Sequence, residues 1–585
     1  MAQQTANPRD ASATAAAAHQ PEGATLANRL AAKLSGLWTI DRRRADRAGI
    51  GVVACWLALA IFYALRLPLV MDELQGGFSA WQLSSGVPYR DFQPYKTVLG
   101  YAVQEPLLAL WPGSWWAKLH AVRIEMAVFA AVVMVAAARR LSTMLRPSAV
   151  LLALVLWAAM STWLERAIEV RVDMLTAACG LFALLGLLDG RVVRAGLWAG
   201  LSLCVSQKGA YYVLAGGAAA FAQHALATHG WAALRGGVLA GLRFGAAASV
   251  PLLVYLAGFA ALAGAAPVLD SVFLHNRAIA LDNLYDVGIK YYWFQTFKRN
   301  PLFWSAALLG LATTVLARRS RSARPLDVTL GTFGAGLIAL ALWHKQPWPY
   351  FFVIVVPTLF VLLARFLDYE IDREIDNEID NEIDNENDVE LDRETDDEEA
   401  SPSDQPRAPK NARHHKEDAT RGGRIGPLAL FIFVALGLVW PLSRLGKAAR
   451  RDDSGQRAVV VGLERLLGAD DAYLAGLVAL PSRRHVLPKQ LSWLDVRGVT
   501  ALRSGDQAAT AAALRADPPL LVVDSYRTRG LPGPLRAYVE EETAPLCGAL
   551  RHRVVALDGE QAVVPADGRY RLVASGPVQL GESGE

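Results

Sequence analysis

Long apolar runs dominate the pattern of this chain. A helix needs about 20 apolar residues to cross a bilayer, and about eleven stretches near that length recur along the sequence. Because lipid offers no partners for open backbone groups, such runs must be helical. The pattern therefore predicts an all-α polytopic membrane domain of about 11 transmembrane helices. The predicted spans lie near residues 49–70, 119–138, 148–163, 173–188, 195–206, 209–227, 239–265, 301–317, 328–343, 350–367 and 426–443.

The basic residues between these runs predict an orientation. Short loops rich in Lys and Arg stay in the cytoplasm. When the runs are threaded in order, the clusters DRRRADR, ARR, DGRVVR, ALRGG and ARRSRSAR all fall on one side. We therefore expect a multi-pass protein of a bacterial inner membrane with a cytoplasmic N-terminus and with Asp72, Asp173 and Lys208 outside. The net charge of +4 is explained by this topology and gives no indication of a nucleic-acid partner.

The composition also divides the chain into domains. Residues 1–48 are small and polar and are expected to be a disordered cytoplasmic tail. Residues 49–367 form the predicted membrane catalytic domain, with an external loop at 72–118. An acidic low-complexity cytoplasmic loop of repeated E-I-D-N type follows at 368–424, before the last transmembrane helix at 425–445. For the acidic loop a plain spacer, calcium binding and partner docking stay open.

Residues 446–585 differ from the rest of the chain. Their apolar runs are short and β-branched, as in AVVVGL, LLVVDSY and HRVVAL, and alternate with helix-like stretches such as DQAATAAALRAD. This alternation predicts a small extracytoplasmic α/β domain. Asp524 follows the run LLVV, where a ligand contact and a structural cap are both open, and the structural cap is the simpler reading.

The polar residues at the outer ends of the runs carry the candidate chemistry. Asp72 and Glu73 end the first run, where two carboxylates are costly unless they are used. A carboxylate can take a proton from an acceptor hydroxyl, and a Lys, an Arg or a bound cation can stabilise a leaving phosphate. Such groups suit a phosphate-bearing lipid substrate, although for Arg171 simple snorkelling to the interface stays open. Further candidates at the same ends are Tyr89, Asp91, Lys96, Asp173, Lys208, His344 and Lys345.

Several motifs resemble one known superfamily in the same order. They are DE at the end of the first run, GVPYRDF, QPYKTVLGY, EVRVDML, SQKG and HKQPWPYFFVIVVPTLFVLLA. Together they resemble the polyprenyl-phosphate-dependent glycosyltransferases of the GT-C class, which include the protein O-mannosyltransferases and the aminoarabinose transferase of lipid A. The resemblance covers residues 49–367. One departure is Thr97 after Lys96, where the aminoarabinose branch has Pro.

The resemblance implies a role for each candidate. Asp72 would be the catalytic base, and Glu73 would assist it or hold the acceptor. Asp173, Tyr89 and Asp91 would position donor or acceptor, and Asp72 with Asp173 is a candidate pair for a divalent metal cation. The donor phosphate would be bound by Lys96, Arg171, Lys208, His344 and Lys345.

These roles together predict an inverting glycosyltransferase. It would move a sugar from a polyprenyl-phosphate donor to a hydroxyl of a lipid, glycan or protein acceptor at the outer face of the membrane. A transporter or flippase, an envelope glycan polymerase or ligase, and an envelope scaffold are the alternatives. A transporter would place polar groups within its spans and show symmetry between its halves, and neither feature is apparent in the sequence.

Overall fold

The computed structural model describes residues 40–94, 96–226, 230–274, 289–317, 325–344, 348–373, 453–476, 483–487 and 505–554, with shorter stretches between 432 and 451 and around residue 480. The predicted tail before residue 40, the acidic segment after residue 373 and Lys345 lie outside these residues. The chain divides into two compact units, Met1–Val461 and Gly462–Glu585.

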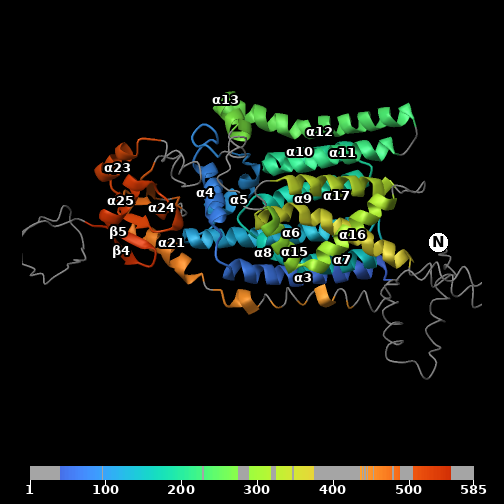
Figure 1. The fold of residues 1–585 in the computed structure, drawn as a ribbon, viewed down its shortest axis with the longest axis horizontal. Helices are drawn as coiled ribbons and strands as arrows, with labels where there is room; N and C mark the ends of the chain where they lie inside the picture. Colours follow the sequence, from blue (N-terminus) through green and yellow to red (C-terminus); the bar gives the residue numbers. More distant parts are fainter. Residues whose placement is uncertain are drawn as a thin grey trace, which may run out of the picture. The chain divides into compact units, whose positions relative to one another are not determined.

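The first unit is a bundle of apolar helices (Figure 1). Within the described residues, five helices are long and apolar enough to cross a membrane: Arg42–Arg66, Trp115–Leu141, Trp231–Ala263, Pro325–Trp343 and Pro349–Arg373. All ten predicted spans before residue 373 are helical, which confirms the predicted multi-span membrane domain. The predicted span at 426–443 is described only in fragments.

The helices of this unit follow the apolar runs closely. They are α3 (Arg42–Arg66), α4 (Met71–Ser85), α5 (Leu99–Leu110), α6 (Trp115–Leu141), α7 (Pro147–Ala159), α8 (Ser161–Arg166), α9 (Asp173–Leu188), α10 (Val192–Val205), the 3-10 turn η1 (Gln207–Gly209), α11 (Ala210–Ala225), α12 (Trp231–Ala263), α13 (Ala265–Leu269), the π-helical turn η2 (Asp270–Leu274), α15 (Ile289–Arg299), α16 (Pro301–Ala317), α17 (Pro325–Trp343) and the 3-10 turn η4 (Pro349–Phe351) that opens the helix Pro349–Arg373.

The predicted external loop is itself partly helical. It contains α4 and α5, which lie at one end of the long helices (Figure 1). Between them, Tyr89 has a positive φ of 68° and is buried against α12, where its ring packs edge-on against Phe259. The loop is therefore a folded cover over one end of the bundle.

A buried ion pair holds α4 to the bundle. Arg123 of α6 binds both carboxylate oxygens of Glu73, at 2.7 and 2.5 Å, and the Glu73 side chain is 0% exposed. Arg123 also donates to the carbonyl oxygens of Leu67 and Pro68, at 2.5 and 2.9 Å, where α3 ends. The Glu73 carboxylate accepts the backbone N–H of Val170 at 3.0 Å. One pair thus joins α3, α4, α6 and the segment before α9.

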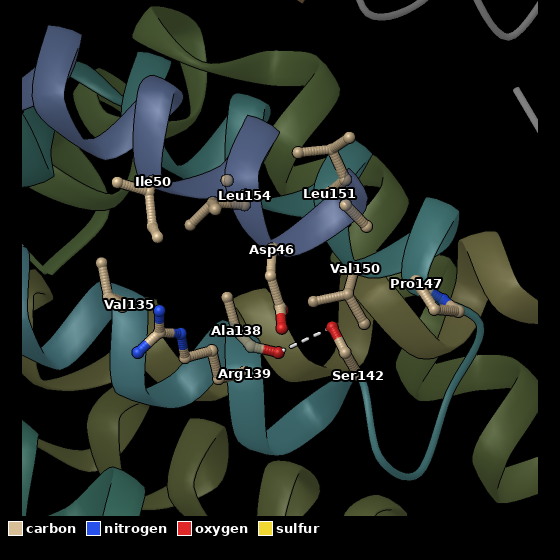
Figure 2. A pocket seen from close by; sticks show the side chains of 12 residues that line it. Asp46, Ile50, Val135, Ala138, Arg139, Ser142, Pro147, Val150, Leu151 and Leu154 are labelled. Atoms are coloured by element: carbon tan, nitrogen blue, oxygen red, sulfur yellow. Dashed lines mark hydrogen bonds between the residues drawn. The ribbon is translucent and has the colours of Figure 1, made fainter. Parts of the chain in front are cut away.

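Turns that carry basic residues lie at the opposite end of the bundle. Arg140 at the end of α6 pairs with Asp189 at the end of α9, and Arg146 pairs with Asp372 at 2.5 Å. A cavity of about 20 Å³ lies there between α3, α6 and α7, with Asp46, Arg139 and Ser142 in its wall (Figure 2). This volume holds about one water molecule, so the cavity cannot take a substrate.

The second unit carries a mixed five-stranded sheet in the order β2-β1-β3-β5-β4. The first three strands are parallel, and β5 is antiparallel to β3 and β4. This sheet, with its helices, confirms the predicted small α/β domain. Its elements are β1 (Ala472–Leu474), β2 (Arg484–His485), α23 (Gln507–Ala516), β3 (Leu521–Val523), α24 (Tyr526–Arg529), α25 (Gly533–Glu541), β4 (Thr543–Cys547) and β5 (Leu550–Arg553).

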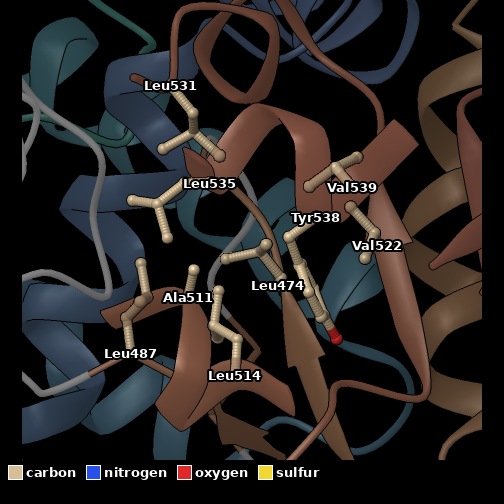
Figure 3. Close-up of a cluster of buried hydrophobic side chains, with 9 residues drawn as sticks. All are labelled: Leu474, Leu487, Ala511, Leu514, Val522, Leu531, Leu535, Tyr538 and Val539. Carbon is tan, nitrogen blue, oxygen red and sulfur yellow. The ribbon is translucent and has the colours of Figure 1, made fainter. Parts of the chain in front are cut away.

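An apolar core fills the space between this sheet and its helices. Leu474 and Val522 from the strands pack with Leu514 of α23 and with Leu535 and Tyr538 of α25 (Figure 3). At the end of β3, Asp524 pairs with Arg529 at 2.9 Å, which agrees with the structural reading of that acid.

One apolar run of residues 446–585 is helical, although its sequence is typical of a strand. AVVVGL lies within the helix α21 (Ser454–Leu466). Val460, Leu463 and Leu467 are buried, and their spacing of three and four residues is that of one helix face. This amphipathic spacing outweighs the preference of the valines for a strand.

Replacing Arg123 with Met should destabilise the membrane unit. The change leaves the Glu73 carboxylate buried without its partner, which costs about 3–5 kcal/mol. Thermal unfolding in detergent measures this effect. Arg44→Met, which removes an exposed pair with Asp41, should change the melting temperature little. An Arg123→Met protein that melts with the wild type would show that the pair does not hold the fold.

Candidate functional site

A chain of four charged side chains lies at the end of the bundle where α4 begins. Arg171 donates to Asp72 at 2.5 Å and to Asp173 at 2.8 Å. Lys208 donates to the second oxygen of Asp173 at 2.5 Å. The four residues come from three segments far apart in sequence, and they alternate in sign from Asp72 to Lys208.

Local backbone contacts fix each member of this chain. Asp72 lies in the first turn of α4, next to the anchored Glu73. The carbonyl of Arg171 accepts the side-chain N–H of Gln104 at 3.0 Å. Asp173 begins α9, where a carboxylate interacts favourably with the helix dipole. Lys208 is held in the turn η1 between α10 and α11.

Gly209 explains how closely η1 packs. A Cβ atom at Gly209 would lie 2.3 Å from the backbone of Ser202 and Leu203. No real Cβ contact is that short, so only glycine lets the turn rest on the end of α10. The position of the neighbouring Lys208 depends on this contact.

Two aromatic rings form one wall of the site. The Arg171 guanidinium lies 3.4 Å from the centre of the Tyr350 ring, and the Lys208 ammonium lies 4.8 Å from it. Phe351 stacks on His344 with 4.3 Å between ring centres, and the His344 ring contacts the Tyr211 hydroxyl at 2.7 Å. Tyr350 is not among the residues that the sequence patterns single out, although its place as the first residue of the predicted span 350–367 was a usable signal.

The electrostatics of the site keep Asp72 ionised. Burial alone would raise the pKa of the Asp72 carboxyl, but Arg171, with a smaller contribution from Lys96, holds the pKa below its ordinary value. Behind Arg171, burial raises the pKa of Glu169 to about 7. Among the residues that the structure describes, one Glu169 oxygen has no hydrogen-bond partner, and it lies 3.8 Å from Arg171.

Lys96 adds a cation that no carboxylate of the described residues neutralises. Its ammonium lies 5.0 Å above the Tyr101 ring and is in no salt bridge within that part of the chain. Asp72 and Asp173 therefore lie among three cations, Arg171, Lys208 and Lys96, because the nearby Glu169 is paired with a fourth cation, Arg166. A site with this surplus of positive charge favours an anion.

The other predicted residues have separate places. Glu73 is buried beneath the site, with both oxygens bonded to Arg123 and to backbone N–H groups. The Tyr89 hydroxyl donates to the Lys96 carbonyl at 2.9 Å, so it supports the backbone of that residue. Asp91 accepts the Val87 N–H at 2.7 Å and closes an exposed turn.

The geometry does not fit the predicted metal pair. Arg171 lies between Asp72 and Asp173 and uses an oxygen of each. In the part of the chain that the structure describes, no group of three or more His, Cys, Asp or Glu side chains could hold a metal ion. In this arrangement the two carboxylates are bridged by a guanidinium.

Comparisons with known proteins give a distant structural similarity. No protein-family model and no curated protein matches the sequence. The chain is similar to the oligosaccharyltransferase of Archaeoglobus fulgidus in the apo form, with 11% identity, a TM-score of 0.47 and coverage of 85% of this chain and 72% of that one. It is also similar to AglB, the oligosaccharyltransferase from Archaeoglobus fulgidus in complex with an inhibitory peptide and a dolichol-phosphate, with 13% identity, a TM-score of 0.44 and coverage of 81% and 69%. Similarities of this size do not identify an activity.

Replacing Gly209 with Ala should disturb the site through packing alone. The added methyl group meets backbone atoms that cannot move aside, and overpacking of this kind costs about 1–3 kcal/mol. The melting temperature in detergent should fall accordingly. Gly236→Ala is the matched control, since a Cβ there meets nothing within 4 Å. Equal effects of the two changes would contradict the tight packing of η1.

Proposed function

We propose that this chain is a membrane glycosyltransferase that moves a sugar from a polyprenyl-phosphate donor to an acceptor hydroxyl with inversion. The observation that carries the proposal is an ionised carboxylate, Asp72, held beside a surplus of cations at one end of an apolar helical bundle. A lipid phosphate and a hydroxyl nucleophile need these two groups close together.

The arrangement of the motifs supports the proposal. The resemblance to the GT-C class rests on segments that include Asp72, Arg171, Asp173 and Lys208, and these four side chains form one connected chain. Residues that are 136 positions apart in sequence, Asp72 and Lys208, thus belong to one group of contacts.

In this mechanism Asp72 is the general base. Its lowered pKa makes it a weak base, so it accepts the hydroxyl proton only while the new C–O bond forms and the attacking oxygen becomes acidic. The oxygen attacks the anomeric carbon from the side opposite the phosphate, and the bond between that carbon and the phosphate oxygen breaks. The product therefore has the inverted configuration.

The cations stabilise the leaving group. Polyprenyl phosphate gains negative charge as the glycosidic bond breaks, and Lys208 and Lys96 are placed to balance it. Arg171 bridges Asp72 and Asp173, while its guanidinium stacks on the Tyr350 ring. The lipid tail would lie between helices, and His344 borders the site through Phe351.

We further propose that the site faces the outer side of a bacterial inner membrane. The basic turns lie at the opposite end of the bundle, and such turns remain in the cytoplasm. The acceptor would then be a lipid, glycan or protein of the envelope. Glu73 has no contact with substrate in this proposal, because it is buried and fully bonded.

Replacing Asp72 with Asn should remove most of the transfer activity. Loss of a general base costs about 10²–10⁴-fold in rate. The measurement is release of polyprenyl phosphate from a panel of labelled polyprenyl-phosphate sugars, in membranes that contain the native acceptors. Asp270→Asn, the same change at an exposed position of η2, should leave the rate unchanged. Near-normal transfer by Asp72→Asn would exclude Asp72 as the base.

Removal of divalent metal should leave the activity intact. Arg171 already bridges the two carboxylates, so no metal is needed to bring them together. Transfer in chelator-treated membranes should match that of untreated membranes, while Arg171→Met should be inactive in both. Activity that is lost with chelator and restored by Mg²⁺ or Mn²⁺ would contradict this role of Arg171.

A further inference from the structure

A larger cavity lies at the side of the bundle, outside the chain from Asp72 to Lys208. Its volume is about 250 Å³. Most of its wall is apolar and comes from the end of α7, the start of α16 and residues 436–437. The apolar lining is Leu156, Ala159, Pro301, Leu302, Phe303, Leu436 and Gly437. A space with such walls suits a hydrocarbon chain.

A glycine brings the three segments together. A Cβ atom at Gly437 would lie 2.6 Å from Leu156 and 4.0 Å from Leu302. A larger residue would therefore push its helix away from α7. Because the backbone at Gly437 approaches α7 this closely, the cavity is a slot between helices.

The polar part of the lining is basic. Lys298 and Arg299 end α15, directly before the apolar wall. The Lys298 ammonium is exposed and is in no salt bridge within the described residues. Arg299 lies 3.9 Å from Glu165. The Asn300 side chain already forms hydrogen bonds within the fold: it accepts the N–H of Ser161 at 2.9 Å and donates to the Ser161 hydroxyl at 3.1 Å.

The helix α15 has the character of a membrane-interface helix. Tyr291, Phe294 and Phe297 are exposed at a spacing of three residues, which places them on one face. Trp293 packs inward against Trp304 and Phe352. Exposed aromatic residues of this kind lie at the level of the lipid headgroups, so Lys298 and Arg299 at the end of α15 lie at that level as well.

We propose that this cavity binds one anionic phospholipid. An acyl chain lies in the apolar slot between α7, α16 and residues 436–437, and the phosphate lies on Lys298 and Arg299. Basic groups beside a slot between transmembrane helices are suited to an anionic headgroup, and Arg and Lys both bind phosphate oxygens. This lipid would be a resident ligand, separate from the donor and independent of the transfer reaction.

Native mass spectrometry of the full chain in mild detergent tests the proposal. The protein is titrated with phosphatidylglycerol or with phosphatidylcholine, which have similar chains and different headgroup charge. The wild type should bind one phosphatidylglycerol in preference to phosphatidylcholine. Lys298→Ala should weaken that binding about fivefold, as expected for one Lys near a membrane surface, and Leu302→Trp should weaken it by filling the slot.

Arg66→Ala is the matched control. Arg66 is an exposed cation at the end of α3 and does not line the cavity, so its removal should leave lipid binding as in the wild type. Wild-type affinity in both Lys298→Ala and Leu302→Trp would overturn the proposal, as would equal binding of the two lipids. Displacement of the lipid by inorganic phosphate at a concentration equal to that of the lipid would show that the apolar slot adds nothing to the affinity, and would overturn the proposal too.

Discussion

The buried pair between Glu73 and Arg123 determines where the candidate site lies. Glu73 accepts from Arg123, from the backbone at Val70 and from the backbone at Val170. A charge removed from water is tolerated only when it is paired and hydrogen-bonded in this way. Because the pair joins α4 to the end of α3, to α6 and to the segment before α9, it sets the position of Asp72, directly before Glu73, and of Arg171, directly after Val170. The two adjacent acids thus have different places: one anchors the turn, and the other faces the cations.

Arg171 depends on this anchor and extends it. Its guanidinium has a flat fork of donors, which lets it bind Asp72 and Asp173 at once while its face rests on Tyr350. A compact ammonium could not form this set of contacts. Arg171 bridges both carboxylates, and Lys208 binds the second oxygen of Asp173. The excess positive charge that an entering anion meets therefore comes from Lys96, beside this bonded group. Preorganised charge of this kind needs no rearrangement when a phosphate leaves.

The sequence alone predicts the helices well, because the hydrophobicity of each apolar run depends only on neighbouring residues. The sequence also predicts Asp72, Asp173 and Lys208 as candidate site residues, since charged groups at the ends of such runs are costly unless they are used. The resemblance makes Asp72 the base and gives Glu73 an assisting role, but it does not predict that Glu73 is buried and bonded, because that state depends on Arg123, which is 50 positions away from Glu73. The bridge by Arg171 and the wall formed by Tyr350 are likewise long-range contacts. In the C-terminal region the valines of AVVVGL favour a strand locally, whereas packing of one face makes the segment helical.

Exposure distinguishes the structural ion pairs of this bundle from the candidate site. Arg365 pairs with Asp327 and Asp368 at the opposite end, and all three are buried. Such a closed group, with one guanidinium between two buried carboxylates, holds helices together. At the candidate site, by contrast, the Asp72 and Lys208 side chains are 26% and 23% exposed. They are ionic groups held in place by the fold yet open to a ligand, and that combination is the one that a catalytic base and a phosphate-binding cation require.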